Sequence, residues 1–186
     1  NQTSKSRSSQ TRKTLAVIFR RPKDRKMDIK TILDEFHKDK TISNDTIASI
    51  QNDNNLRFAF VNHFRQYKDR EFALAVLDRF ISIRQDPNCK MSAENLMFAC
   101  YILGLHNHIE DSLKIWEAKI TDFDTYCGLD IQLVPFAGVK ETIAFLKTQT
   151  TVEGKKALVY VSECFNCGDF DNIEEYFSKE TYPWFI

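Results

Sequence analysis

The sequence predicts an all-α fold in which antiparallel helix pairs stack as an α-solenoid behind a basic N-terminal extension. Two observations carry this prediction. Gly and Pro number 5 and 4 among 186 residues, below their average usage, which disfavours a barrel or sandwich with many tight turns. Apolar residues recur with a helical period from residue 28 onward. We therefore expect an extension over residues 1–26 and one helical-repeat domain over residues 27–186.

Each expected helix is bounded by the ends of its apolar period and by capping or breaking residues. Residues 69–84 are apolar nearly all round, which predicts a well-buried helix that Pro87 ends. Ser92 and Asp124 are the expected N-caps of two later helices. Almost no strand is expected. The predicted helices cover residues 27–36, 41–52, 55–66, 69–84, 93–105, 110–120, 126–134, 139–148, 152–166 and 172–179.

The predicted helices form pairs that repeat along the chain. In the second helix of four pairs, a small or β-branched residue precedes a bulky one by four positions, and successive pairs are separated by 39, 30 and 31 residues. A two-helix unit buries its apolar stripe by stacking on its neighbours, so we expect the leading residues at close helix crossings. These residues and their bulky followers are Ala73 and Leu77, Ser112 and Trp116, Thr142 and Leu146, and Ile173 and Phe177.

Residues 168–177 resemble the inter-helix turn and second helix of a tetratricopeptide repeat, with Gly168 as the turn glycine. Residues 103–118 are a looser match, and residues 123–146 are similar to the related pentatricopeptide unit. The resemblance covers roughly residues 53–181 and implies a solenoid of stacked helix pairs. An irregular helical bundle with chance spacing is the alternative interpretation.

A tetratricopeptide groove that grips peptide carboxylates carries Asn, Lys and Arg on its first helices. Asn62 and Arg65 fit this pattern in the first pair, but the corresponding row continues with Glu94 and Asp124. We therefore expect neither a carboxylate clamp nor a base-reading pentatricopeptide tract.

Residues with catalytic potential form no recognised motif, because glycine-rich phosphate loops and HExxH are absent from the sequence. We expect no enzyme activity, no cofactor and no metal site. Cys164 and Cys167 form a CxxC at helical spacing. Packing as small hydrophobes is favoured there over a redox site or a metal site completed by His106 and His108. The apolar runs are too short to cross a membrane.

Formal charge is unevenly distributed along the chain although it sums to zero. Residues 1–30 hold ten basic and two acidic residues, a net charge of +8, whereas residues 107–186 carry −7. A basic arm on an acidic body predicts contact with RNA phosphates, and a solvated tail is the alternative. The arm residues that we expect to bind RNA are Arg12, Lys13, Arg20, Arg21, Lys23, Arg25 and Lys26.

These features predict a non-catalytic scaffold of a ribonucleoprotein, with the arm on RNA and the helical body against neighbouring proteins. The layout resembles accessory proteins of the mitochondrial ribosome, which implies ribosomal RNA as partner and the mitochondrial matrix as location. A first residue of Asn rather than Met fits a cleaved transit peptide and equally a truncated chain. The main alternative is a tetratricopeptide-like protein–protein adaptor without RNA. A peripheral subunit on anionic lipid is disfavoured, because the arm has no apolar face before Leu15.

The last five residues, 182–186, are rich in aromatic and apolar side chains. Burying one large apolar side chain stabilises a fold by about 1.5–3 kcal/mol, so we expect this segment to turn back over Tyr160, Phe177 and Leu158. The alternative is an anchor for a neighbouring subunit. The protein-binding residues in that case are Trp184, Phe185 and Ile186.

Overall fold

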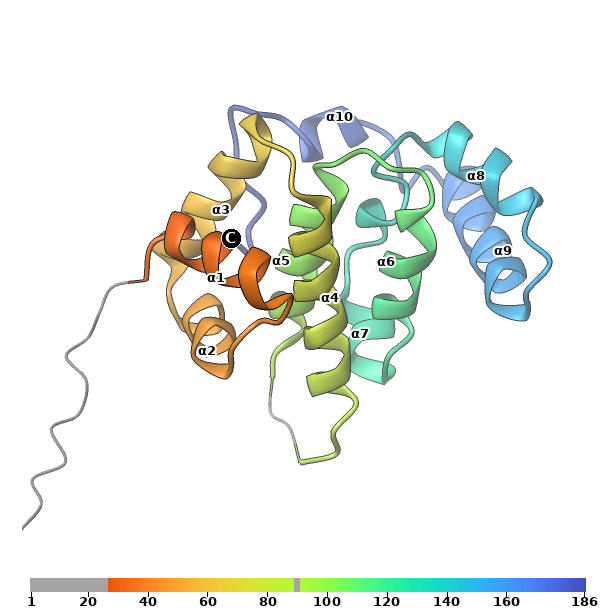
Figure 1. The fold of residues 1–186 in the computed structure, drawn as a ribbon. Helices are drawn as coiled ribbons and strands as arrows, with labels where there is room; N and C mark the ends of the chain where they lie inside the picture. The colour runs from red at the N-terminus through yellow and green to blue at the C-terminus, as the bar shows by residue number, and fades with distance from the viewer. Residues whose placement is uncertain (1–26, 89–90) are drawn as a thin grey trace, which may run out of the picture.

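A computed structural model describes residues 27–88 and 91–186, and all the regular secondary structure in these two ranges is helical (Figure 1). The predicted all-α class is therefore confirmed. The elements are α1 (Ile29–Asp39), α2 (Asn44–Asn52), α3 (Asn54–Gln66), α4 (Arg70–Arg84), α5 (Ala93–Gly104), α6 (Asp111–Lys119), α7 (Phe123–Gly128), the 3-10 helix η1 (Ile131–Leu133), α8 (Val139–Lys147), α9 (Val152–Cys167) and α10 (Ile173–Tyr176).

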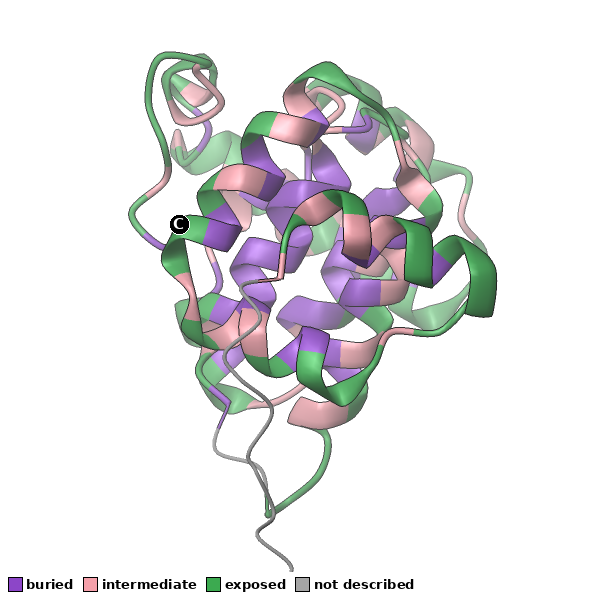
Figure 2. Ribbon diagram, turned by 60° about the vertical axis from the view of Figure 1, so that its left-hand side comes forward, coloured by how far each residue is buried: buried purple, intermediate pink, exposed green. Residues whose placement is uncertain are grey.

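Helix α5 lies at the centre of the fold. Every residue from Asn95 to Gly104 is buried, because α3, α4, α6, α7 and η1 all pack against this helix. Buried segments accordingly concentrate on the inward-facing sides of the surrounding helices (Figure 2). Gly104 also allows Phe136, in the segment between η1 and α8, to approach α5 closely, since a Cβ at position 104 would overlap the Phe136 ring.

A cluster of buried phenylalanines joins α1, α3 and α4. The ring of Phe72 lies 5.2 Å from that of Phe36 and 5.4 Å from that of Phe60, measured between centroids. Phe64 completes the cluster at 6.1 Å from Phe72. All four side chains are at most 3% exposed. Aromatic pairs at these separations stabilise a core by more than the buried area alone contributes. The cluster therefore holds α1, α3 and α4 together.

The region after α6 differs from the predicted single helix over residues 126–134. Helix α7 begins earlier and ends at Gly128, and η1 follows it. The predicted N-cap at Asp124 is wrong, because Asp122 caps the helix: its carboxylate accepts from the Thr125 amide at 2.9 Å, and the Thr125 hydroxyl accepts from the Asp122 amide at 3.0 Å. Ser92 does occupy the N-cap of α5, although its side chain makes no capping hydrogen bond.

Three of the four residues expected at helix crossings are buried. Ala73 and Thr142 are fully buried and Ser112 is 3% exposed. Ile173 is only half-buried, on the one-turn helix α10. Gly168 adopts a left-handed conformation with φ of 85° as the C-cap of α9, the conformation that glycine adopts at lowest cost. The predicted turn glycine is therefore confirmed at this position.

Helices α8 and α9 form one end of the molecule, where α9 packs against α8 and α6 (Figure 1). Only Gly154, Ala157 and Val161 of the 16 residues in α9 are buried. Cys164 is half-buried, but Cys167 is exposed, so the expectation that both thiols pack inside is wrong for Cys167. After α10 the chain crosses back over the molecule towards α3 (Figure 1).

Candidate protein-binding groove

The seven arm residues expected to bind RNA lie outside the described residues. They are Arg12, Lys13, Arg20, Arg21, Lys23, Arg25 and Lys26. The net charge of the arm remains a property of the sequence, and contact with RNA stays a prediction.

The C-terminal segment turns back on its own chain, as expected, but it covers a different surface. Phe185 is 4% exposed and Ile186 is 8% exposed. The ring of Phe185 packs against Tyr101 of α5 at 6.1 Å, rather than against Tyr160 and Leu158. Trp184 is 66% exposed, although its indole N–H donates to Asp130 at 3.2 Å. Of the three proposed anchor residues, only Trp184 offers a free face to a partner.

Arg65 of α3 holds the start of this segment. Its guanidinium donates to the carbonyl oxygens of Ser178, Lys179 and Thr181 at 3.1, 2.9 and 2.7 Å, and lies 4.6 Å from the centroid of the Tyr182 ring. The Tyr182 hydroxyl donates to Asn62 at 2.6 Å. Asn62 and Arg65, which fit a peptide-binding row, therefore bind the chain's own backbone and tyrosine.

Arg57, two turns earlier on α3, holds the end of the segment. It donates to the Phe185 carbonyl at 3.2 Å and to the carbonyls of Ile50 and Gln51 at 2.8 and 3.0 Å, and it also bonds the side chain of Asn95. The pKa of Arg57 is lowered because the side chain is buried, and the nearby carboxylate of Glu94 offsets only part of this effect. The side chain is only 6% exposed, so it caps the last turn of α2 and anchors the chain end from inside the protein.

A separate apolar groove of about 740 Å³ runs along the outer face of α9. Its walls combine this face with side chains from α6, the segment after α6, and α7. The lining residues are Trp116, Ile120, Tyr126, Val152, Lys155, Lys156, Val159, Tyr160 and Glu163. Val152 and Val159 are 62% and 57% exposed. Exposed aliphatic side chains gathered in one groove make it a candidate binding surface.

Three aromatic rings form the floor of the groove. Tyr160 lies 5.4 Å from Trp116 and 5.6 Å from Tyr126, measured between ring centroids. Trp116 is 3% exposed, and its buried indole nitrogen has no hydrogen-bond acceptor within the described chain. Because buried polar groups are nearly always hydrogen-bonded, this unpaired donor is an unusual feature of the floor.

Lys119 supports this floor from behind. Its ammonium donates to the carbonyls of Tyr126 and Leu129, each at 2.8 Å, and lies 5.6 and 5.4 Å from the ring centroids of Tyr126 and Tyr160. The residue is 2% exposed. Desolvation lowers its pKa, partly offset by nearby Cys164 and Cys127. Lys119 therefore fixes α7 and both tyrosines in the positions that shape the groove.

Charged residues lie at two places along the α9 side of the groove. Lys155 and Lys156 lie near the start of α9, and Glu163 lies two turns further along the same helix. This side of the groove therefore has a basic part and an acidic part.

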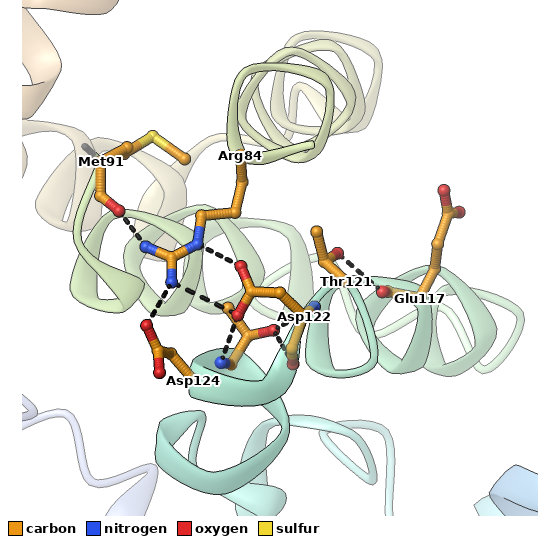
Figure 3. Close-up of polar contacts among 7 residues, drawn as sticks. Arg84, Met91, Glu117, Thr121, Asp122 and Asp124 are labelled. Carbon is orange, nitrogen blue, oxygen red and sulfur yellow. Dashed lines mark hydrogen bonds and ion pairs between the residues drawn. The ribbon is translucent and has the colours of Figure 1, made fainter. Parts of the chain in front are cut away.

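A second polar cluster, around Arg84, has a structural role (Figure 3). Arg84 donates to Asp122 at 2.5 Å and to Asp124 at 3.2 Å, and it also bonds the Met91 carbonyl. The bond to Asp122 raises the pKa of Arg84, and the same bond lowers the pKa of Asp122. Because the arginine neutralises these carboxylates, the cluster ties the end of α4 to the start of α7.

Neither a metal cluster nor a membrane-spanning helix is present in residues 27–88 and 91–186. No group of three or more His, Cys, Asp or Glu side chains could hold a metal ion there, and no helix there is both long and apolar enough to cross a membrane. Cys164 is not an activated thiol, because burial raises its pKa to about 11.

This groove was not predicted from the sequence, where Tyr160 was expected to lie under the C-terminal segment and Val152 and Val159 had no expected role. Val152, Val159 and Tyr160 recur at helical spacing, which was the available signal for a second apolar stripe. No family model, curated protein or solved structure matches the chain.

Proposed function

We propose that this protein is a non-catalytic scaffold whose helical body binds a protein partner in the groove along α9. The observation that carries the proposal is the groove itself, with Val152 and Val159 exposed above an aromatic floor. Full burial of an exposed large apolar side chain is worth about 1.5–3 kcal/mol. Both valines are already partly covered, so a partner that covers the groove recovers part of this free energy.

The finer architecture in this proposal is a tetratricopeptide-like stack of helix pairs. The predicted first helices of successive pairs, α3, α5 and α7, support it, because α5 packs against both of the others. Helix α4 also packs against α5, as a second helix does against the first helix of the next pair. The contact between α6 and α9 lies outside such a simple order, so the stack applies best to the first half of the domain.

A ribonucleoprotein role is the second candidate, favoured by the separation of charge along the chain. Residues 1–30 carry +8 and residues 107–186 carry −7, so the arm can bind phosphates while the body avoids them. In this form of the proposal, the scaffold belongs to the mitochondrial ribosome in the matrix, with ribosomal RNA under the arm. In the alternative proposal, the protein is a protein–protein adaptor that binds its partner through the groove and binds no RNA.

Photo-crosslinking tests the protein-binding role. A benzophenone amino acid placed at Val159 should form adducts in cell extract that protease removes and ribonuclease does not. The same probe at Tyr67, which is 61% exposed on another face, is the matched control. Adducts at position 159 should disappear in a Val152→Glu background. Equal adduct yields at the two positions, or insensitivity to Val152→Glu, would refute binding through the groove.

A salt series tests the RNA-binding role. If about six phosphate contacts form, the logarithm of the association constant should fall against the logarithm of salt concentration with a slope of about −4 to −5. Deletion of residues 1–26 should abolish this dependence. RNA affinity that survives the deletion, or that ignores salt, would contradict a role of the arm on phosphates.

A further inference from the structure

We infer that the partner segment in the α9 groove is an amphipathic α-helix with acidic residues towards one end and a basic residue towards the other. This inference rests on the proposed protein-binding role of the groove and adds the chemical class and polarity of the partner. It is drawn from the shape of the groove and from the placement of Lys155, Lys156 and Glu163.

The shape of the groove fits a helix. Its residues on α9 run from Val152 to Glu163, which spans about 16 Å at 1.5 Å per residue. Three turns of a partner helix have the same length. The groove is open on the side of α9, since Val152 and Val159 are both more than half exposed. It therefore differs from a small-molecule site, which encloses most of its ligand. An apolar helical face laid along a groove is a recurrent mode of peptide recognition.

The charged residues of the groove determine where the acidic and basic side chains of that helix lie. Lys155 and Lys156 follow the first turn of α9, so acidic side chains are favoured opposite their ammonium groups. Glu163 lies eight residues after Lys155, about 12 Å along the helix, and favours a basic side chain at that distance. The basic part stands out because residues 107–186 have a net charge of −7.

A single-stranded nucleic acid fits the groove less well. Such ligands require a cationic track for the backbone and exposed aromatic faces for the bases. Here the track stops at Glu163, and the exposed groove residue between the lysines and this glutamate is Val159. Two of the three floor rings, those of Trp116 and Tyr160, are largely covered by protein. The groove therefore matches an aliphatic helix face better than stacked bases.

Designed peptides test this inference on the full chain. The probe is an 18-residue helical peptide with leucines at i, i+3, i+4 and i+7, three glutamates at one end and two lysines at the other. A second peptide replaces the glutamates by lysines, and a third has glutamine at every charged position. Fluorescence anisotropy of labelled peptides gives the dissociation constants. The first peptide should bind at least tenfold more tightly than the second.

Charge variants of the protein locate the contact. Lys155→Glu with Lys156→Glu should weaken binding of the first peptide about tenfold. Lys140→Glu with Lys147→Glu, on exposed positions of α8, makes the same change of net charge away from the groove and should leave binding within twofold. Glu163→Lys should weaken binding as well, and replacing the peptide lysines by glutamates should restore it. That rescue distinguishes a direct contact from general electrostatic attraction.

The outcomes separate this inference from the proposed function on which it rests. Preference for the lysine peptide, equal binding of all three peptides, or equal effects of the α8 and α9 variants would overturn the inference. So would tighter binding of an oligouridylate than of the acidic peptide. If none of the peptides binds while position 159 still cross-links to protein, the helix is refuted and the protein-binding groove stands. If no peptide binds and position 159 forms no specific cross-link to protein, both the inference and the proposed function are refuted.

Discussion

Helices α5 and α9 are of similar length but have opposite environments. In α5, ten consecutive residues from Asn95 to Gly104 are buried, whereas α9 buries three of its sixteen residues and exposes Val152 and Val159. Both helices carry apolar side chains on more than one face. On α5 neighbouring helices cover all of these faces. On α9 one apolar face is left open.

This contrast indicates how stability and binding are divided between two regions of the molecule. Around α5 the apolar area is already buried within the chain, so substitutions there should change the free energy of unfolding. Along α9 the open face contributes little to folding, so substitutions there should change partner binding instead.

Deletion of residues 182–186 should give the largest loss of stability. It removes the buried side chains of Phe185 and Ile186, for a loss of about 3–6 kcal/mol at roughly 1.5–3 kcal/mol each. Urea denaturation measures the change. Trp184→Ala, at a position 66% exposed, is the control and should cost less than about 1 kcal/mol. Unchanged stability with loss of assembly would instead make this segment an anchor for another subunit.

Phe98→Ala and Val159→Ala compare the two helices directly. Phe98 of α5 is fully buried, and its truncation should lower the free energy of unfolding by about 3–5 kcal/mol. Val159 of α9 is 57% exposed, and its truncation should change stability by less than about 0.5 kcal/mol. Chemical denaturation of both variants gives the difference. Similar losses for the two variants would mean that the α9 face is covered within the folded chain.

Arg57→Met tests the buried cation that joins α2, α3 and the chain end. The variant keeps an apolar stem of similar length but leaves the carbonyls of Ile50, Gln51 and Phe185 without this donor. Unsatisfied buried groups cost about 1–3 kcal/mol, and we expect a loss of about 2–3 kcal/mol, measured by denaturation. Arg79→Met removes an exposed bond to Asn44 and should be nearly neutral. A neutral Arg57→Met would show that these carbonyls find other partners.

A smaller effect should appear with pH, through His106. Its Nε2 accepts from the Asp69 amide at 2.9 Å, so the ring is neutral and Nδ1 donates to the carbonyls of Ile102 and Leu103. Burial lowers the pKa of His106 below its ordinary value of 6.5. In the unfolded chain the ring gains a proton as pH falls through about 6.5, whereas in the folded protein it stays neutral to lower pH. Stability should therefore fall with acidification in that window.

Thermal melting between pH 7.5 and 5 measures this contribution. His106→Gln removes the titrating ring and can still accept from the Asp69 amide, so its melting temperature should depend less on pH than that of the parent. His108→Gln, at an exposed position, is the matched control for loss of a histidine. Parallel pH profiles for His106→Gln and the parent protein would contradict the assignment.

Much of the helical architecture could be predicted because it depends on local periodicity. The bounds of α3, α4 and α9 lie within one residue of those expected. The start of α7 could not be placed, since Asp122 and Asp124 are both acceptable caps by sequence. Arg84, far earlier in the chain, bonds both carboxylates, and Asp122 is the one that pairs with Thr125.

The binding surfaces could be predicted only in part, because tertiary packing decides which apolar face stays open. The sequence of α9 offers two apolar faces, and the fold buries only the one around Ala157 and Val161. Likewise, the aromatic residues at 182–186 predicted that the segment folds back. Its destination depends on Arg57 and Arg65, whose bonds to backbone carbonyls leave no mark in the local sequence pattern.

The junction beside α2 has a mechanical consequence. The hydroxyl of Ser49 donates to the Met27 sulfur at 3.4 Å, and Arg57 links the neighbouring Ile50 carbonyl to that of Phe185. Residue 27 and the chain end marked in Figure 1 therefore emerge beside the same helix, away from α9. A pulling force applied between a segment before residue 27 and one attached after residue 186 would act on this junction beside α2. Fluorophores or tethers joined to these two chain positions should leave α8 and α9, at the other side of the fold, unaffected by the force.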